Sequence, residues 1–311
     1  MYDFIKTNVI DSSRFEQNII NNKIADLMTF TNNFTGEIQE YPKCGKYLNL
    51  DIKINPFHSK LSGSLHKFEN LVFLGEDQNY NDFTYLQLSS LIPRLEETFD
   101  LKGNNSLSYL ELGFNLKLDF DPKKLIDNNL LMYDYKSHAK NLKFRGNGDY
   151  KEFTKTDSSI KIYNKSKQYG KEFKISNNIL RIELKLKSKR IIQRLGIFSL
   201  NDLLDKEKIF TVFKFLYNEY QKLMIIDGLD KFDIPQQDLE KLNKYTNPNY
   251  WQRLRENKSY KVRYNLKKNC NLLIKKYNLD TLKRELDDKL MNKFWELIDF
   301  NEVDLFQPKS S

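Results

Sequence analysis

Several features that define common protein classes are scarce or absent in this sequence. It contains only two cysteines, Cys44 and Cys270, which lie far apart and lack the short spacing of metal ligands. We therefore expect reduced thiols, the usual state in the cytosol. The first residues, MYDFIKTNVIDSSRF, lack a basic segment followed by an apolar run, so no signal peptide is predicted. No stretch approaches the roughly 20 apolar residues of a membrane helix, and an intracellular protein without a membrane partner is expected.

Three motifs that identify large enzyme classes are also missing. There is no Walker phosphate-binding loop, no glycine fingerprint for dinucleotides and no nucleophile-elbow serine. These absences argue against nucleotide hydrolases of the Walker type, dinucleotide-dependent enzymes and serine hydrolases. No small-molecule cofactor is predicted.

Positive charge and aromatic residues, in contrast, are plentiful. Lysine and arginine number 51 against 42 aspartate and glutamate residues, which gives a formal net charge of +9. Hydrophobic residues make up 40% of the chain and aromatic residues 14%, enough to build a packed core. A basic surface favours polyanionic partners such as nucleic acid or acidic lipid head groups.

The most informative stretch is residues 158–187, where polar and apolar residues alternate on either side of a lysine-rich insertion. Alternation with a period of two predicts two strands, each with one buried and one solvated face. If the strands pair antiparallel, Tyr163 and Glu183 emerge on the same solvated face, among cations. A tyrosine beside a carboxylate on a basic surface suits phosphoryl transfer. The simpler interpretation is an amphipathic hairpin with a charged outer face.

The same periodicity arguments predict the remaining elements. Strands are expected at 2–9, 47–54, 61–68 and 107–120, and helices at 82–100, 122–135, 189–196, 200–226 and over most of 236–300, with a loop at 143–150. The fold class is therefore α+β: a mostly antiparallel central sheet backed by helices, followed by an all-helical C-terminal region. We place the domain boundary near residue 200, which gives domains 1–200 and 201–311.

Polar side chains from four predicted strands are expected on one common face of the sheet. They are Asp51, His66, Glu111 with Asn115, and Tyr163 with Glu183. Carboxylates with a histidine suit Mg²⁺ or Mn²⁺, which would polarise a phosphodiester while the tyrosine hydroxyl attacks it in line. Phosphate oxygens would be held by Lys161, Lys165 or Arg181.

These candidates differ in how strongly the sequence supports them. Glu111 lies in an otherwise very apolar strand, where a carboxylate must be paired, solvated or metal-bound. His66 also fits a satisfied surface or core histidine, and Asp51 alone is a weak candidate. Tyr150 and Tyr169 are alternatives to Tyr163 as long as only the residue pattern is considered.

Four segments together resemble the rolling-circle replication initiators of filamentous phages, the gene II protein type, and related phage and plasmid initiators. The segments are SGSLHKFEN (62–70), LSYLELGFN (107–115), IKIYNKSKQ (160–168) and NILRIELKLKSKRIIQRLGI (178–197). The resemblance covers roughly residues 47–205. It implies a site-specific nickase and strand transferase, in which a tyrosine attacks one strand of the origin DNA and forms a 5′-phosphotyrosine link.

The resemblance also implies roles for individual residues. Tyr163 would be the nucleophile, and Lys165 and Arg181, selected above from the residue pattern, are the other catalytic candidates. Metal ligands would come from Glu111, Glu183 and His66, with Asp51 as a further candidate. The family often carries a His-hydrophobe-His pair, which this sequence lacks, so coordination of Mg²⁺ or Mn²⁺ mainly by carboxylates is expected. DNA contacts are assigned to Lys161, Lys167, Lys185, Lys187, Lys189 and Arg190.

The implied partners are single-stranded or supercoiled origin DNA and, through the C-terminal helices, a host helicase or polymerase. The expected location is the cytoplasm of a bacterial host that carries the phage or plasmid. Two alternatives remain open at the level of sequence. One is a non-catalytic DNA-binding replication regulator, in which lysine- and arginine-rich helices such as 250–278 contact phosphates. The other is a transposase-like or relaxase-like strand transferase.

Overall fold

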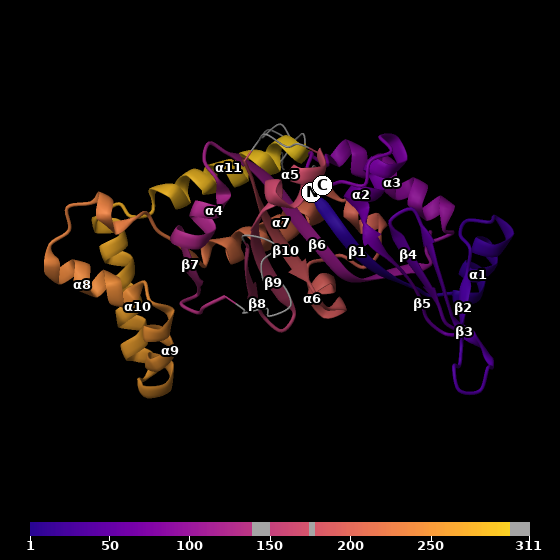
Figure 1. Cartoon of the computed structure of the whole chain (residues 1–311), viewed down its shortest axis with the longest axis horizontal. Coiled ribbons are helices and arrows are strands. Elements are labelled where there is room, and N and C mark those ends of the chain that lie inside the picture. Colours follow the sequence, from indigo (N-terminus) through magenta and orange to yellow (C-terminus); the bar gives the residue numbers. More distant parts are fainter. Residues whose placement is uncertain (139–149, 174–177, 299–311) are drawn as a thin grey trace, which may run out of the picture.

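The computed structural model describes residues 1–138, 150–173 and 178–298 of the chain (Figure 1). Most of the loop predicted at 143–150 therefore lies outside the described residues. Of the helices that are described, none is long and apolar enough to cross a membrane.

The centre of the molecule is a nine-stranded sheet in which every pair of neighbouring strands is antiparallel. In spatial order the strands are β2 (Met28–Thr31), β3 (Ile38–Tyr47), β4 (Leu50–Ile54), β5 (Ser59–Ser64), β1 (Tyr2–Val9), β6 (Asn105–Leu118), β10 (Asn178–Leu186), β9 (Ser158–Asn164) and β8 (Tyr150–Thr154). A separate two-stranded ribbon pairs β7 (Leu130–Tyr133) with β11 (Leu223–Ile225). The predicted α+β class is confirmed.

The helices within the described residues flank the sheet and extend beyond it (Figure 1). They are α1 (Ser12–Asn21), α2 (Leu65–Phe73), α3 (Tyr85–Thr98), α4 (Pro122–Lys124), α5 (Lys165–Phe173), α6 (Lys189–Arg194), α7 (Lys206–Gln221), α8 (Gln236–Tyr245), α9 (Pro248–Asn257), α10 (Tyr260–Lys276) and α11 (Thr281–Ile298). The lysine-rich insertion between the two strands of the predicted hairpin is thus the helix α5.

One face of the sheet is apolar and is covered by α7 and α11. On β6 the alternate residues Leu110, Leu112, Phe114, Leu116 and Leu118 are all buried, as the period-two pattern predicts. Phe114 packs edge-on against Phe213 of α7, with 5.6 Å between ring centroids, and Phe213 stacks on Phe294 of α11 at 3.8 Å. The opposite, polar residues of β6 therefore face away from this helical layer.

The predicted strand at 61–68 is wrong in its second half. The strand β5 ends at Ser64, and α2 begins at Leu65, so His66 lies on a helix. The cause is a helix cap, because the Ser64 side chain accepts a hydrogen bond from the Lys67 backbone N–H. The predicted strand at 47–54 is likewise divided by a turn in which Leu48 has φ of 54°.

Two predicted helices are shorter than expected because apolar residues at one end of each form the β7–β11 ribbon. The helix predicted at 122–135 is limited to α4 and a π-helical turn, Leu125–Asn129, before β7 begins. The helix predicted at 200–226 starts at Lys206, capped by Asp205, and ends at Gln221. The helix predicted at 82–100 remains continuous through Pro93 and is capped by Thr84.

The C-terminal helices fall into two packing groups. Side chains of α7 and α11 belong to the same core as the sheet, whereas α8, α9 and α10 pack around two smaller clusters that they share with the β7–β11 ribbon, through Met132 and Met224. This second group begins and ends at one point, because Asp227 N donates to Leu279 O at 2.8 Å and Thr281 N donates to Asp227 Oδ2 at 3.0 Å. Figure 1 shows α8–α10 at one end of the molecule, away from β1–β5. The functional division near residue 200 stays a prediction.

Candidate active site

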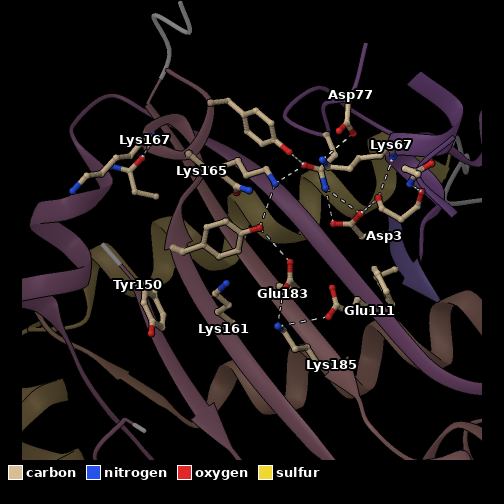
Figure 2. A pocket seen from close by; sticks show the side chains of 18 of the residues that line it. Asp3, Lys67, Asp77, Glu111, Tyr150, Lys161, Lys165, Lys167, Glu183 and Lys185 are labelled. Atoms are coloured by element: carbon tan, nitrogen blue, oxygen red, sulfur yellow. Dashed lines mark hydrogen bonds and ion pairs between the residues drawn. The ribbon is translucent and has the colours of Figure 1, made fainter. Parts of the chain in front are cut away.

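The polar face of the sheet contains a cleft of about 1090 Å³ (Figure 2). Its floor is formed by side chains of β1, β6, β10, β9 and β8, which alternate with the buried residues of the same strands. Residues of α5 and α2 form further walls, and the β3–β4 hairpin, Ser64 of β5 and the segment between α2 and α3 line the rest. The lining includes six carboxylate residues, Asp3, Asp51, Asp77, Glu111, Glu152 and Glu183, and six lysines, Lys46, Lys67, Lys161, Lys165, Lys167 and Lys185.

Three of these carboxylates form a cluster on adjacent strands. Asp3 of β1, Glu111 of β6 and Glu183 of β10 each offer an oxygen, and these oxygens lie within 4.8 Å of one another. Ser64 Oγ donates to Asp3 Oδ1 at 2.5 Å and fixes that carboxylate. Sequence reasoning selected Glu111 and Glu183 but missed Asp3. Asp3 falls in the predicted strand 2–9, where polar and apolar residues do not alternate regularly, so no signal marked it.

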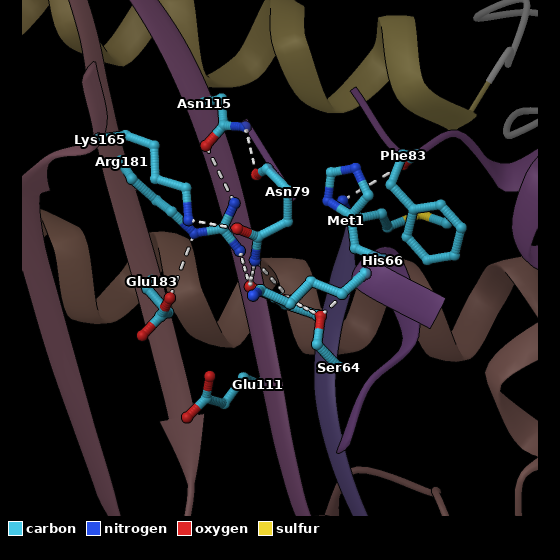
Figure 3. Close-up of polar contacts among 12 residues, drawn as sticks. Met1, Ser64, His66, Asn79, Phe83, Glu111, Asn115, Lys165, Arg181 and Glu183 are labelled. Atoms are coloured by element: carbon cyan, nitrogen blue, oxygen red, sulfur yellow. Dashed lines mark hydrogen bonds and ion pairs between the residues drawn. The ribbon is translucent and has the colours of Figure 1, made fainter. Parts of the chain in front are cut away.

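A buried arginine holds this cluster together (Figure 3). Arg181 donates to Asp3 Oδ2 at 2.5 Å, to Glu183 Oε2 at 3.2 Å and to Asn115 Oδ1 at 2.9 Å. Gly113 makes this placement possible, because a Cβ there would lie 2.5 Å from one guanidinium nitrogen. Burial would raise the pKa of the Asp3 carboxyl, but the guanidinium brings that pKa well below its usual range. Arg181 thus satisfies two carboxylates, and its guanidinium is directed at them rather than at solvent.

Lys185 occupies the space between the other two carboxylates. Its Nζ lies 3.6 Å from Glu111 Oε1 and 3.5 Å from Glu183 Oε1. Burial and the neighbouring charge of Glu183 raise the pKa of Glu111 to about 7. Burial acts in the same direction on Glu183, but Arg181 and then Lys185 bring its pKa below the ordinary value. The carboxylate crowding is therefore only partly relieved by the protein's own cations.

Tyr163 extends from β9 to the edge of the carboxylate cluster. Its Oη lies 3.3 Å from Glu183 Oε2 and 3.3 Å from Lys165 Nζ, and Lys161 Nζ lies 4.4 Å from the ring centroid. The antiparallel register places Tyr163 opposite Arg181 on β10, so the predicted shared face of tyrosine and carboxylate is present. Burial and the charge of Glu183 raise the pKa of the phenol well above 10. An ionised Tyr163 would therefore require extra positive charge.

Asn79, in the segment between α2 and α3, links the lysine to the carboxylates. Its Nδ2 donates to both oxygens of Asp3, at 3.1 and 3.0 Å. Its Oδ1 accepts from Lys165 Nζ at 2.6 Å and from Tyr169 Oη at 2.7 Å. Burial, followed by the charge of Arg181, lowers the pKa of Lys165 to about 7. No sequence pattern marks Asn79, because it lies in a segment without periodicity.

The segment that carries Asn79 is itself fixed to the sheet. Asn115 Nδ2 lies within hydrogen-bond distance of the carbonyl oxygens of residues 79–81, at 3.5, 3.1 and 3.0 Å. Asn115 is the residue whose side-chain oxygen accepts from Arg181. One asparagine on β6 therefore positions both the arginine and the segment opposite it.

Two predicted metal ligands lie apart from the cluster. His66, on α2, is buried, stacks on Phe83 with 5.1 Å between centroids, and pairs through Nε2 with Asn81 Oδ1 at 2.6 Å. Burial lowers the pKa of His66 to about 3. Asp51 lines the cleft but is exposed, with Lys46 Nζ 3.6 Å away. Neither residue belongs to the three-carboxylate group found among the described residues.

The cations predicted to contact DNA divide into two sets. Lys161, Lys167 and Lys185 line the cleft, together with the predicted catalytic Lys165. Lys187, Lys189 and Arg190, at the end of β10 and the start of α6, are not among its lining residues. Arg190 forms an ion pair with Asp157 instead.

No protein-family model and no curated protein matches this chain. Among solved structures, the chain is similar to the rolling circle replication initiator protein from Geobacillus stearothermophilus. The identity is 15% and the TM-score 0.35, over 61% of this chain and 75% of that one. A likeness of this size carries no argument about activity. The functional interpretation therefore rests on the geometry of the cleft.

Proposed function

We propose that this chain is a metal-dependent DNA nickase and strand transferase that initiates rolling-circle replication of a phage or plasmid in the bacterial cytoplasm. The observation that carries the proposal is the position of one phenol. Tyr163 Oη lies 3.3 Å from Glu183, which belongs to a group of three carboxylates on neighbouring strands. A hydroxyl nucleophile beside a hard-cation site is the arrangement that metal-assisted phosphodiester transfer requires.

The carboxylate cluster fits Mg²⁺ or Mn²⁺ by the chemistry of its donors. Asp3, Glu111 and Glu183 offer only oxygen, which these cations prefer. A bound Mg²⁺ or Mn²⁺ would polarise the scissile phosphate and stabilise an ionised phenol. Lys185 now lies between Glu111 and Glu183, so its side chain would have to move when a cation binds. Like-charge crowding, expressed in the raised pKa of Glu111, favours such an exchange.

In the proposed reaction, Tyr163 Oη forms a bond to phosphorus as the bond from phosphorus to the 3′-oxygen breaks. Lys165 Nζ, 3.3 Å from the phenol, accepts its proton, and a proton is returned to the departing 3′-oxygen. Lys161 and Lys167, which also line the cleft, would contact phosphate oxygens. The product is a 5′-phosphotyrosine and a free 3′-hydroxyl, and the reverse transfer rejoins the strand.

The test is a covalent adduct with supercoiled or single-stranded DNA from the replicon that encodes the chain, in Mn²⁺. We expect wild-type protein to give an adduct that survives denaturing electrophoresis, and Tyr163→Phe to give none. Tyr150→Phe and Tyr169→Phe are matched controls, because both tyrosines line the same cleft, and they should retain the adduct. An adduct formed by Tyr163→Phe would show that another residue is the nucleophile.

A non-catalytic DNA-binding replication regulator is the second candidate. It is favoured by the mutual satisfaction of charges in the cleft, where Lys185 pairs with Glu111 and Glu183 and Arg181 pairs with Asp3. Steeply salt-dependent DNA binding without cleavage in any divalent metal would support this candidate. In either case we propose that residues 201–311 contribute contacts with DNA or with a host helicase or polymerase.

A further inference from the structure

The positive charge of the chain is concentrated in one helical hairpin, α9–α10. Residues 248–276 contain nine lysine or arginine residues and one glutamate, a net charge of +8 within a chain whose total is +9. The hairpin belongs to the group α8–α10 at one end of the molecule (Figure 1). It contributes no residue to the lining of the cleft that contains Tyr163. The basic composition of the protein is thus mainly a property of this hairpin.

Most of these cations have no partner within the part of the chain that the structure describes. Arg253, Lys258, Lys261, Lys268 and Lys275 are exposed and form no ion pair or side-chain hydrogen bond among the described residues. Lys261, Lys268 and Lys275 are spaced by seven residues, which places them along one side of α10. In addition, Arg263 Nε is buried yet lacks a hydrogen-bond partner among the described residues. Unpaired charge of one sign along a helix indicates a polyanionic ligand.

Aromatic side chains accompany the cations. Tyr260 and Tyr264 are 75% and 57% exposed and stack on each other, with 6.4 Å between ring centroids. They border a groove made of two adjoining cavities of about 400 and 410 Å³ that share Tyr135, Tyr264 and Lys267. The one carboxylate in the groove, Asp134, is paired with Lys267 at 2.9 Å. The groove therefore offers ring faces and cations together.

We propose that this groove and the adjoining side of α10 bind single-stranded nucleic acid, with bases on Tyr260 and Tyr264 and phosphates on Lys268 and Lys275 in the groove and on Lys261 beside it. Exposed ring faces discriminate in favour of a single strand, because the base faces of a duplex are already stacked. From Tyr260 to Lys275 the helix extends about 22 Å, long enough to follow several nucleotides. This surface is separate from the cleft, and the proposal does not depend on nicking.

The test measures binding of the full chain to a fluorescein-labelled DNA strand of about 16 nucleotides, without divalent metal, by anisotropy over a range of salt concentrations. We expect Lys261→Glu, Lys268→Glu and Lys275→Glu together to weaken binding about tenfold or more. The slope of log affinity against log salt should become shallower by about two. The control is Lys102→Glu, Lys214→Glu and Lys289→Glu, three exposed lysines elsewhere, which change net charge equally and should leave affinity within about twofold.

A second pair of variants tests base stacking without changing charge. Tyr260→Ala with Tyr264→Ala should weaken binding of the single strand about fivefold or more, whereas Tyr260→Phe with Tyr264→Phe should retain it. The matched duplex and vesicles of acidic phospholipid serve as competitors. Equal effects of the two lysine triples, or binding of duplex or vesicles as tight as that of the single strand, would overturn the proposal.

Discussion

The cleft and the α9–α10 hairpin use lysine and arginine in opposite ways. At the floor of the cleft Lys165, Arg181 and Lys185 are largely desolvated and directed at specific oxygens, as Arg181 is at Asp3 and Glu183. On the hairpin the cations are exposed, and most of them are unpaired within the described residues. Buried and paired cations fix geometry but are costly to disturb. Exposed and unpaired cations contribute little to stability and much to attraction of a polyanion. Net charge alone does not distinguish these two uses.

Among the substitutions that test this difference between buried and exposed cations, replacing Arg181 should have the largest effect, on the free energy of unfolding. Arg181→Met leaves Asp3 and Glu183 buried without their main counter-charge, and we expect a loss of about 3–5 kcal/mol in the free energy of unfolding. The measurement is urea denaturation followed by circular dichroism. Arg190→Met is the control, because the Arg190 side chain is exposed in its ion pair with Asp157, and its loss should be much smaller than that of Arg181→Met. Equal losses of unfolding free energy in the two variants would mean that Arg181 stabilises the fold no more than an exposed arginine does.

The raised pKa of Glu111 gives a pH-dependent effect of intermediate size. A carboxyl whose pKa is about 7 in the folded chain and 4.5 in the unfolded chain binds more protons when folded between these values. The native state therefore loses stability as pH rises from about 4.5 to about 7. Glu111→Gln removes this titration, so its stability relative to wild type should increase by about 1–3 kcal/mol from pH 4 to pH 8. Urea unfolding at both pH values, without divalent metal, tests the sign, and an advantage that shrinks as pH rises would contradict it.

Removing Lys185 should have the smallest effect of these substitutions, and we expect that effect on the affinity for a metal ion. Lys185→Ala eliminates the positive charge between Glu111 and Glu183, and we expect Mn²⁺ to bind about tenfold more tightly. Titration calorimetry measures the change. Lys187→Ala is the matched control, because Lys187 directly follows β10 and is not among the lining residues of the cleft. Unchanged or weaker Mn²⁺ binding by Lys185→Ala would show that the carboxylates do not form the cation site.

Period-two alternation predicted the part of the site that depends on local structure. Tyr163, Glu111 and Glu183 are correctly placed on one face because each lies within a single regular strand. Asp3 could not be assigned in the same way. The strand β1 inserts between β5 and β6, which are distant in sequence, and its register with β6 shifts between Tyr2 and Ile5. Alternation within β1 therefore predicts neither which strands lie beside β1 nor which side chains Asp3 faces.

The error at His66 has a local physical cause. His66 was assigned to a strand because apolar and polar residues alternate before it, but the cap at Ser64 starts a helix one residue earlier than His66. The roles of Lys165 on α5 and of Lys185 on β10, in contrast, depend on burial and on partners from other segments of the chain, which no pattern within their own elements reveals. Sequence thus predicts which residues share a face, and tertiary contacts decide which of them interact.

The hydrogen bonds that join Asp227 to Leu279 and Thr281 have a consequence for how this molecule is divided. A cut near residue 200 would strip α7 and α11 from the sheet and expose Phe114. The group α8–α10, in contrast, is an insertion whose two ends lie side by side, at Asp227 and Thr281. A short linker between these two residues would therefore replace the whole group. Internal excision of α8–α10, rather than truncation, is therefore the way to separate the proposed nicking site from the proposed polyanion surface.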